Sequence, residues 1–369
     1  MTTVNWRRIG RAVALRDLAK SGLAVVLGLG LSALLLAATG TNVPNAASAM
    51  LQGSVGSPLA ITQTLVQAIP ITVVGLGVAF AFRGGLFNIG GDGQLYIGAL
   101  CAVQIGLWLA NFPPIARLTF LLAAGAVGGA LWGGAAGWMR SRLRMNEVIT
   151  TLLMNYIGFW FVSYLVHGPL MDPTGGGYPW TRALGAGATI GDVSIGTFAI
   201  PVGFLFTLGI AVSLAFVLRY TQFGIDTRTL GDNPSAAEFS GVRTSMRLIQ
   251  IMLVSGAVAG LGGALDLAGN QYRLSDFFSP GYGYTAIAVA LVGNASPVGT
   301  VLAGLFFGAL TAGAGAMERI AGVPAPVTGV IQGLIIFTLV CARSAIVWSS
   351  ISRLAGPVRS RVLETTRSA

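Results

Sequence analysis

The chain has 369 residues, of which 54% are hydrophobic and only 9% are charged. A soluble globular domain carries about 25% charged residues, so this composition excludes a soluble enzyme or binding domain as the main body of the protein. The net charge of +10 does not indicate a nucleic-acid partner, because most of the basic residues flank apolar runs, as they do at the ends of membrane helices.

The sequence offers little for metal or nucleophile chemistry. Cys101 and Cys341 lie inside apolar runs, and His167 is the only histidine. No Gly-x-x-x-x-Gly-Lys-[Ser/Thr] pattern is present, so the chain lacks a P-loop with which to bind and split ATP. We therefore predict that the protein is not an enzyme and that it binds no metal or cofactor of its own.

Apolar runs of about 20 residues, the length that crosses a bilayer, recur along the chain. They lie at residues 21–40, 61–82, 93–110, 117–138, 148–167, 199–218, 247–267, 298–316 and 326–347. A shorter run at 284–294 either spans the membrane or re-enters it. Counting that run, we predict an all-α integral membrane protein, a polytopic helical bundle of about ten membrane segments.

The basic residues predict which side of the membrane each loop faces. With ten crossings and a cytoplasmic N-terminus, only four arginines fall outside, namely Arg117, Arg182, Arg273 and Arg319. Omitting the 284–294 run would place the C-terminal arginines outside as well. We therefore expect both termini in the cytoplasm, with basic tails at 1–20 and 348–369 and a transmembrane domain at 21–347.

Two loops stand out between the predicted spans. Residues 168–198 form a Gly- and Pro-rich outer loop, and residues 219–247 form the largest inner loop. In the inner loop Asn233 is a good N-cap and Pro234 suits a first helical turn, which predicts one or two turns of helix.

This short inner helix has two interpretations. It ends at Gly241, and we expect its small Ala236 and Ala237 to be exposed. An exposed helix of this kind on the inner side would be a docking surface for another protein. The alternative is an ordinary capped helix in a loop.

The segment GLFNIGGDGQLYIG, Gly85–Gly98, places glycines and polar side chains where a bilayer normally meets Leu and Val. Irregular polar backbone at membrane depth persists only where protein or a water-filled path surrounds it. The segment therefore indicates a protein that conducts something polar. Asp92 could couple protons here, but we favour a role as cap of the helix that follows.

Polar side chains within the predicted spans outline a path for a solute. Glu147, Thr151 and Asn155 recur at helical spacing along one span. The predicted path residues are Gln67, Asn88, Gln94, Glu147, Thr151, Asn155 and Asp266. Amides and carboxylates suit a substrate rich in hydroxyls and ring nitrogens. For each residue, the alternative is a hydrogen bond between helices without any ligand.

Glycines and aromatic residues add three further expectations. Gly256 and Gly260 predict a close-packing helix surface. Tyr282 and Tyr284 are expected near the outer mouth, where an aromatic belt explains them at least as well as substrate stacking. The pattern of apolar, Gly/Asn-rich and apolar residues in 78–100 recurs in 288–310, which suggests a parallel internal repeat or simply Gly-rich packing.

Four segments, in order, resemble the permease subunits of bacterial ABC importers for nucleosides and simple sugars. They are GLFNIGGDGQLYIGA, MNEVITTLLMNYI, LGDNPSAAEFSGV and FSPGYGYTAIAVALVGNASPVG. The likeness runs from about residue 60 to residue 340. Within that group the segments are most similar to nucleoside-type permeases that work with a basic-membrane-lipoprotein binding protein.

The resemblance implies a permease subunit in the bacterial cytoplasmic membrane. Two such subunits, usually different ones, would form the pore. Two ABC ATPase subunits or domains, which hold the ATP and Mg²⁺, would dock beneath it, and an extracytoplasmic lipoprotein would deliver the substrate. The residues implied to contact the ATPase are Gly231, Asn233, Pro234, Ala236, Ala237, Glu238 and Phe239.

The chain departs from the family pattern at two places. Relatives often have Ala-Glu where this chain has Gly91-Asp92, and Arg-Tyr where it has Glu238-Phe239. The second difference inverts a charge at the implied docking surface. The alternative function is an ion-coupled secondary transporter with Asp92, Glu147 or Asp266 as its ion site, although the few intramembrane carboxylates count against it.

Overall fold

The computed structural model describes residues 6–38 and 40–343. The chain separates into two compact units, one made of Met1–Ala49 with Ala314–Ala369 and a larger one made of Met50–Gly313. The predicted basic tail at 348–369 lies outside the described residues, as do residues 1–5 of the N-terminal tail.

In the smaller unit, α1 (Trp6–Ala38) packs against α13 (Ala325–Arg343). Gly28 makes this contact close, because a Cβ at that position would lie 2.7 Å from the Thr338 hydroxyl oxygen and 2.8 Å from the Ile335 Cα. The first part of α2 (Val43–Val55) and the last part of α12 (Pro297–Ala321) also belong to this unit.

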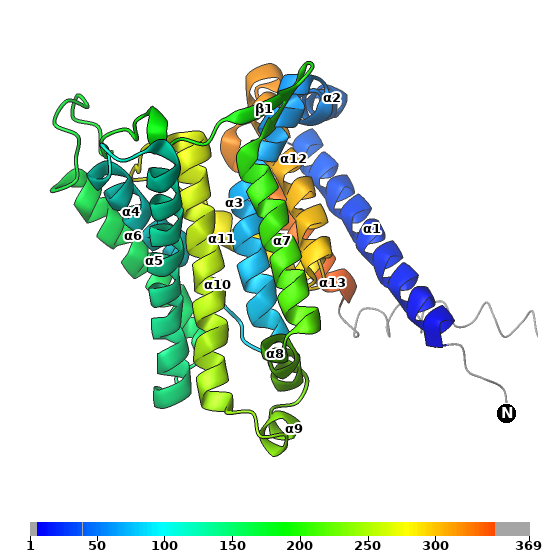
Figure 1. The fold of residues 1–369 in the computed structure, drawn as a ribbon. Coiled ribbons are helices and arrows are strands. Elements are labelled where there is room, and N and C mark those ends of the chain that lie inside the picture. The colour runs from blue at the N-terminus through cyan, green and yellow to red at the C-terminus, as the bar shows by residue number, and fades with distance from the viewer. Residues whose placement is uncertain (1–5, 39, 344–369) are drawn as a thin grey trace, which may run out of the picture. The chain divides into compact units, whose positions relative to one another are not determined.

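The larger unit is a bundle of helices with one small sheet (Figure 1). Its complete helices are α3 (Pro58–Arg83), α4 (Gly91–Trp108), α5 (Pro114–Leu143), α6 (Glu147–His167), α7 (Val202–Tyr220), α8 (Gln222–Asp232), α9 (Pro234–Phe239), α10 (Thr244–Asp266) and α11 (Tyr282–Val292), and it also holds the end of α2 and most of α12. A π-helical turn, Leu267–Gln271, continues α10, and a short 3₁₀ turn lies at Ala186–Ala188. Strands β1 (Asp192–Ile195) and β2 (Phe198–Pro201) pair antiparallel, with Asp192 opposite Pro201.

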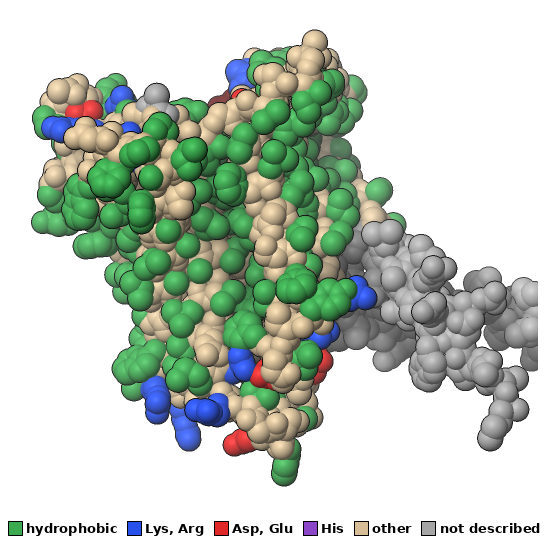
Figure 2. All heavy atoms as spheres, viewed as in Figure 1, with side chains coloured by type: hydrophobic (Ala, Val, Ile, Leu, Met, Phe, Trp, Pro, Cys, Tyr) green, Lys and Arg blue, Asp and Glu red, His purple; other side chains and the backbone are tan. Residues whose placement is uncertain are grey.

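The two ends of this unit differ in charge. We call the end with α8 and α9 the α9 end, and the opposite end, with β1 and β2, the hairpin end (Figure 1). Basic side chains gather at the α9 end in the space-filling view (Figure 2). The helix termini at this end carry Arg83, Arg140, Arg142, Arg219 and Arg243. The α9 end therefore coincides with the side that the charge distribution predicts to be cytoplasmic.

By length and composition, six helices of the described chain can cross a membrane. They are α3, α5, α6, α7, α12 and α10 together with its π-helical continuation, Thr244–Gln271. The apolar stretches Gly22–Ala38 in α1 and Gly329–Thr338 in α13 are shorter. The structure thus confirms a polytopic helical membrane protein, while the number of ten segments stays a prediction.

The predicted run at 284–294 forms most of α11, which has 11 residues and is about 16 Å long. An extended segment precedes it and pairs with the outer loop, where the Leu184 N–H donates to the Tyr272 carbonyl at 2.8 Å and the Thr181 N–H to the Leu274 carbonyl at 2.9 Å. Gly281, with φ of 96°, then starts the helix. The extended segment and α11 together return the chain from the hairpin end to the α9 end.

Three elements were not predicted from the sequence. The hairpin of β1 and β2 adds a small sheet to the predicted helical bundle, α8 lies in the predicted inner loop, and no element was predicted for the residues of α2. The start of α8 does have a local sequence signal, an N-cap residue. The Thr221 hydroxyl caps the helix by accepting from the Gly224 N–H at 3.1 Å. The inner loop predicted at 219–247 is thus largely helical.

Backbone-to-backbone contacts hold α4, α5 and α10 together. We call these contacts the glycine seam, formed by Gly98, Gly125, Gly129, Gly133, Gly256 and Gly260. A Cβ at Gly129 would overlap the Gly256 carbonyl oxygen, and a Cβ at Gly98 would overlap the Gly260 backbone. The close-packing surface predicted from Gly256 and Gly260 is therefore confirmed.

We predict that Gly129→Val destabilises the bundle by about 1–3 kcal/mol or more, because the added side chain has no space. Gly209→Val on α7 is the matched control, since nothing lies within 4 Å of a Cβ at Gly209. Thermal unfolding of the detergent-solubilised protein measures both variants. Equal unfolding temperatures for the two would show that the seam is not close-packed.

Candidate functional site

A non-helical segment, 84–90, runs between α3 and α4 and is held by Asn88. The Asn88 Nδ2 donates to the Gln94 Oε1 at 2.9 Å and to the Ser255 hydroxyl at 2.8 Å. Its Oδ1 accepts from the Gly90 N–H at 3.0 Å and from the Gln94 Nε2 at 3.1 Å. Asn88 is fully buried, so its amide is saturated by the protein itself.

Helix α6 holds the other side of the same segment. The Gly93 N–H donates to the Asn155 Oδ1 at 2.8 Å, and the Asn155 Nδ2 donates to the Ile89 carbonyl at 2.8 Å. One turn away, the Thr151 hydroxyl accepts from the Ile89 N–H at 3.2 Å. The polar residues predicted at helical spacing along α6 thus face polar backbone, and Thr151 and Asn155 bind the polypeptide itself.

Glu147 lies at the α9 end of that stripe. Its carboxylate forms an ion pair with the Arg140 guanidinium on α5, with the Nε 3.1 Å from the Oε2. Asn146 caps α6 by accepting from the Val148 N–H at 2.9 Å. Glu147 therefore joins the ends of two helices, and it does not contact the Asn88 side chain.

Asp92 caps a helix, but a different one from the helix we expected. The Asp92 Oδ1 accepts from the Gly283 N–H at 2.9 Å and from the Ser279 hydroxyl at 2.8 Å, both at the start of α11. The N-cap of α4 itself is Gly90, which has no side chain to offer. Gly283 packs so closely on Asp92 that a Cβ there would overlap the Asp92 backbone nitrogen. The starts of α4 and α11 therefore meet.

Two other predicted path residues lie in separate clusters. The Asp266 carboxylate, 2% exposed, accepts from the Asn270 Nδ2 at 3.0 Å and from the Gln271 Nε2 at 2.6 Å within the π-helical turn. Gln67 on α3 accepts from the Tyr282 hydroxyl at 3.2 Å. The structure thus brings together Asn88, Gln94, Thr151 and Asn155, and it places Gln67, Glu147 and Asp266 in other contacts.

A pair of tyrosines comes together here, of which stacking on Tyr284 was considered from the sequence and Tyr156 was not predicted. Tyr284 on α11 lies beside the Asn155 amide and the Tyr156 hydroxyl of α6. The Tyr156 and Tyr284 side chains are 56% and 43% exposed, so their rings form part of an open face. Nearby on the same part of α6, Trp160 is also exposed.

The position of these tyrosines along their helices gives their depth. Tyr156 follows the start of α6 by nine residues, and Tyr284 precedes the end of α11 by eight. At 1.5 Å per residue, both lie about 12–14 Å from the α9 end. A hydrocarbon core is about 30 Å thick, so this distance is about half of its thickness. Tyr284 was predicted at the outer mouth, and the structure places it beside Asn155 and Tyr156 of α6.

At the hairpin end, the outer loop is tied down by polar contacts. The Thr174 hydroxyl donates to the Asp172 Oδ1 at 2.7 Å and the Thr174 N–H donates to it at 3.0 Å. These bonds, together with Arg273 and Arg182, hold the pKa of Asp172 below its usual value. The Arg273 guanidinium also lies 5.0 Å from the centre of the Trp180 ring. The loop is thereby fixed to the segment that precedes α11.

Helix α9 forms as the sequence predicts, with one correction. Asn233 caps it by accepting from the Ala236 N–H at 3.1 Å, and Pro234 is its first residue. Ala236 is exposed, but Ala237 is fully buried, because the chain turns back and the Val242 N–H donates to the Ala237 carbonyl at 3.0 Å. The side chain that α9 presents is Phe239, which is 95% exposed.

Comparison with known proteins assigns the chain to a family. A family model described as the permease component of branched-chain amino acid transport systems matches residues 60–340. The chain belongs to this permease family. The family is one of transporter permeases and not of enzymes, and the resemblance noted in the sequence is confirmed.

Several relatives of the permease are known. It is 35% identical to the glucose ABC transporter permease TsgB13 of Haloferax volcanii, over 86% of each chain. It is 33% identical to the guanosine permease NupP of Bacillus subtilis (85% of this chain, 90% of NupP) and 31% identical to the nucleoside permease NupB of Lactococcus lactis (85% and 88%). No solved structure matches. The chain is thus a membrane-spanning permease subunit of an ABC importer.

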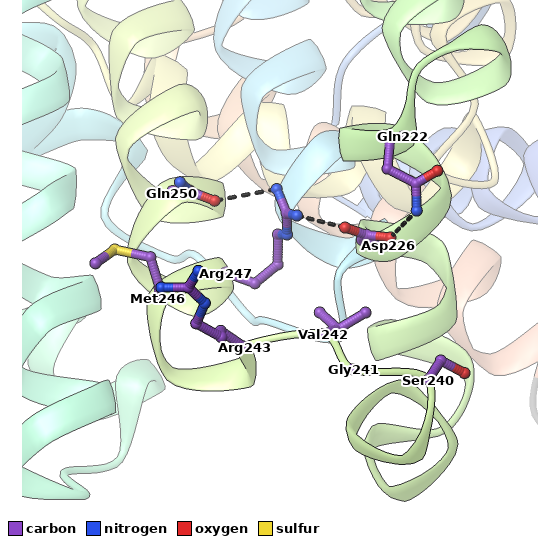
Figure 3. Close-up of a pocket in the computed structure, with 9 residues that line it drawn as sticks. All are labelled: Gln222, Asp226, Ser240, Gly241, Val242, Arg243, Met246, Arg247 and Gln250. Atoms are coloured by element: carbon purple, nitrogen blue, oxygen red, sulfur yellow. Dashed lines mark hydrogen bonds and ion pairs between the residues drawn. The ribbon is translucent and has the colours of Figure 1, made fainter.

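Next to α9, the permease has a polar cleft of about 420 Å³ between α8 and α10 (Figure 3). Arg247 reaches from α10 across the cleft to Asp226 on α8, and its Nη1 donates to the Gln250 Oε1 at 3.0 Å. The Gln222 Nε2 donates to the Asp226 Oδ1 at 2.7 Å. These contacts fix the orientation of α8 against α10, and hence the base from which α9 projects.

We predict that Asn155→Ala lowers the free energy of unfolding by about 2–4 kcal/mol, because the Gly93 N–H and the Ile89 carbonyl lose their partner. Ser213→Ala on α7 is the control, since that hydroxyl bonds only to the Gly209 carbonyl of its own helix. Its expected change is within about 0.5 kcal/mol. If Asn155→Ala abolishes transport while the unfolding temperature stays constant, Asn155 instead contacts the solute.

Proposed function

We propose that this permease forms, together with a second permease subunit, the path by which nucleosides cross the cytoplasmic membrane. ATP hydrolysis on separate ATPase subunits would drive the transport, and the chain itself would bind neither ATP nor Mg²⁺. The α9 end would face the cytoplasm, in keeping with its arginines. A binding lipoprotein would deliver the solute at the hairpin end.

The preference for nucleosides rests on Tyr156 and Tyr284. Aromatic belts lie at the two membrane–water interfaces, whereas this pair lies near mid-depth. Two phenolic hydroxyls and the Asn155 amide thus meet on an exposed face, whereas a face turned only to lipid would be apolar. The face that carries both rings is therefore better explained as a wall of the solute path than as a lipid contact.

The chemistry of this wall suits a planar ring with polar edges. Stacking of a nucleobase on an aromatic side chain contributes about 1–3 kcal/mol and tolerates any base. The hydroxyls of these two exposed tyrosines can hydrogen-bond ring nitrogens or ribose hydroxyls. Relatives named for guanosine and nucleosides agree with this substrate, and the relative named for glucose marks sugars as the competing class.

Two features support the proposed partners. Bacillus subtilis has two guanosine permeases, NupP and NupQ, and Lactococcus lactis has two nucleoside permeases, NupB and NupC, all of them similar to this chain. Such pairs favour a pore built from two different permeases. At the α9 end, the exposed Phe239 offers a large apolar side chain to an ATPase surface.

The ion-coupled alternative finds less support. Asp92 accepts from the start of α11, Asp266 from two amides, and Glu147 is paired with Arg140. Each carboxylate would have to exchange these partners for an ion. An ATP-driven mechanism does not require these carboxylates to exchange their partners.

The decisive experiment reconstitutes the permease, its second permease, the ATPase and the binding protein in proteoliposomes. Uptake of radiolabelled nucleoside should require ATP. Phe239→Ala should reduce uptake about tenfold, as the loss of an interface anchor does, without lowering the unfolding temperature. Tyr220→Ala, which also removes an exposed aromatic ring at this end, should have little effect. Uphill uptake by the permease alone, driven by an ion gradient, would refute the proposal.

The tyrosine wall is tested in the same proteoliposomes. Tyr156→Leu and Tyr284→Leu should each reduce nucleoside uptake about five- to tenfold, because stacking is lost. Phe216→Leu on α7, a ring that is 58% exposed, is the control for a lipid-facing aromatic residue. Unchanged nucleoside uptake in both tyrosine variants would assign this face to lipid or to another subunit.

A further inference from the structure

We propose that Arg83 is a positioning residue that transmits movement of α8 and α9 to the half-length helix α11. The inference rests on the proposed function, in which an ATPase docks on α9. It goes beyond that function by naming the contact through which the ATPase would act on the membrane helices.

Arg83 is the last residue of α3, and its side chain contacts a turn that is distant in the sequence. Its Nε donates to the Ala295 carbonyl at 2.8 Å, and its Nη2 donates to the Asn294 carbonyl at 3.2 Å. Both acceptors lie in the turn that joins α11 to α12, more than 200 residues along the chain. A guanidinium is suited to this task, because its planar fork can bind two adjacent carbonyls at once.

The turn that Arg83 binds is strained. Asn294 and Ala295 have φ of 55° and 47°, and neither is a glycine. Left-handed backbone is unfavourable for Ala295, which, unlike Asn294, has no polar side chain to offset the cost. Two consecutive left-handed residues direct both carbonyls to one guanidinium. The Ala295 N–H closes the turn from within by donating to the Ala290 carbonyl at 2.8 Å, and Arg83 adds a contact from outside that holds both carbonyls.

The backbone of Arg83 also contacts the end of α8. A Cβ at Gly231 would overlap the Arg83 carbonyl oxygen and would lie 2.9 Å from the Gly85 nitrogen. Only Asn233 separates α8 from α9, serving as C-cap of the first and N-cap of the second. A displacement of α9 thus reaches Arg83 through backbone contact, with no flexible side chain between them.

Helix α11 extends from this turn to the proposed tyrosine wall of the solute path. Its first turn binds Asp92 of α4 through the Gly283 N–H and carries Tyr284. When the turn at its other end moves, this short helix moves with it, because its 11 residues form a single rigid element. Arg83 also joins the Gly/Asn-rich parts of residues 78–100 and 288–310, the two segments of the apparent internal repeat. The repeated pattern would thus serve as a contact between the two segments.

The test uses the complete complex in proteoliposomes and measures nucleoside uptake per ATP hydrolysed. For Arg83→Gln, we expect hydrolysis to persist while the ratio of uptake to hydrolysis falls about tenfold, a size typical of coupling between sites. Arg83→Lys should recover only part of the ratio, since an ammonium cannot bind both carbonyls in the same way. Arg219→Gln, at the end of α7 and lying over the Tyr220 ring, is the control and should keep the wild-type ratio.

A second variant separates holding the turn from transmitting movement. Ala295→Gly removes the backbone strain, so Arg83→Gln/Ala295→Gly should recover thermal stability but not the uptake ratio. Recovery of both would show that Arg83 only stabilises the turn and would overturn the proposal. So would an unchanged ratio in Arg83→Gln.

Hydrogen exchange gives a readout that is independent of transport. Trapping the ATPase with ATP and vanadate should change exchange in α11 in the wild-type complex, and this change should be lost in Arg83→Gln. The same change in both proteins would overturn the proposal. Failure of the proposed function would differ from this, because the wild-type complex itself would then take up no nucleoside with ATP.

Discussion

The structure depends on the saturation of the Asn88 amide. Segment 84–90 is not helical, so its backbone cannot satisfy its own polar groups, and a bilayer supplies no water to do so. Asn88 binds Gln94 and Ser255, and Asn155 and Thr151 bind the backbone at Ile89. These bonds allow an irregular segment to persist within a helical bundle. They also fix where α4 begins, which brings Asp92 to the start of α11 and places Tyr284 beside α6.

Much of the fold follows from local patterns in the sequence. Long apolar runs predict the crossing helices because helices are the only form in which an isolated segment satisfies its backbone in lipid. The capping of α9 was predicted to the residue, since Asn233 and Pro234 act within one turn. The charged helix α8 was missed, because a short amphipathic helix among polar residues lacks the apolar run that marked the others.

The contacts of the candidate site were harder to predict. A polar residue in a span signals that it needs a partner, but not whether the partner is backbone or solute. Asp92 was expected to cap the helix that follows it, yet its acceptor atoms serve Gly283, 191 residues away. The burial of Ala237 arises from a turn back to Val242, and the depth of Tyr284 arises from the start of α11 at Gly281. Apart from the turn at Gly241, these contacts have no local signature in the sequence.

The glycine seam has a consequence for the way a solute could be accommodated. Helices that touch through their backbones have no side-chain rotamers at the contact, so they cannot adjust gradually to the size of a passing molecule. Helices α4, α5 and α10 therefore form a stiff block against which other parts must shift. In the proposed path, adaptation to bulkier or slimmer cargo would then fall to the aromatic rings on α6 and α11, which can rotate while the block keeps its shape.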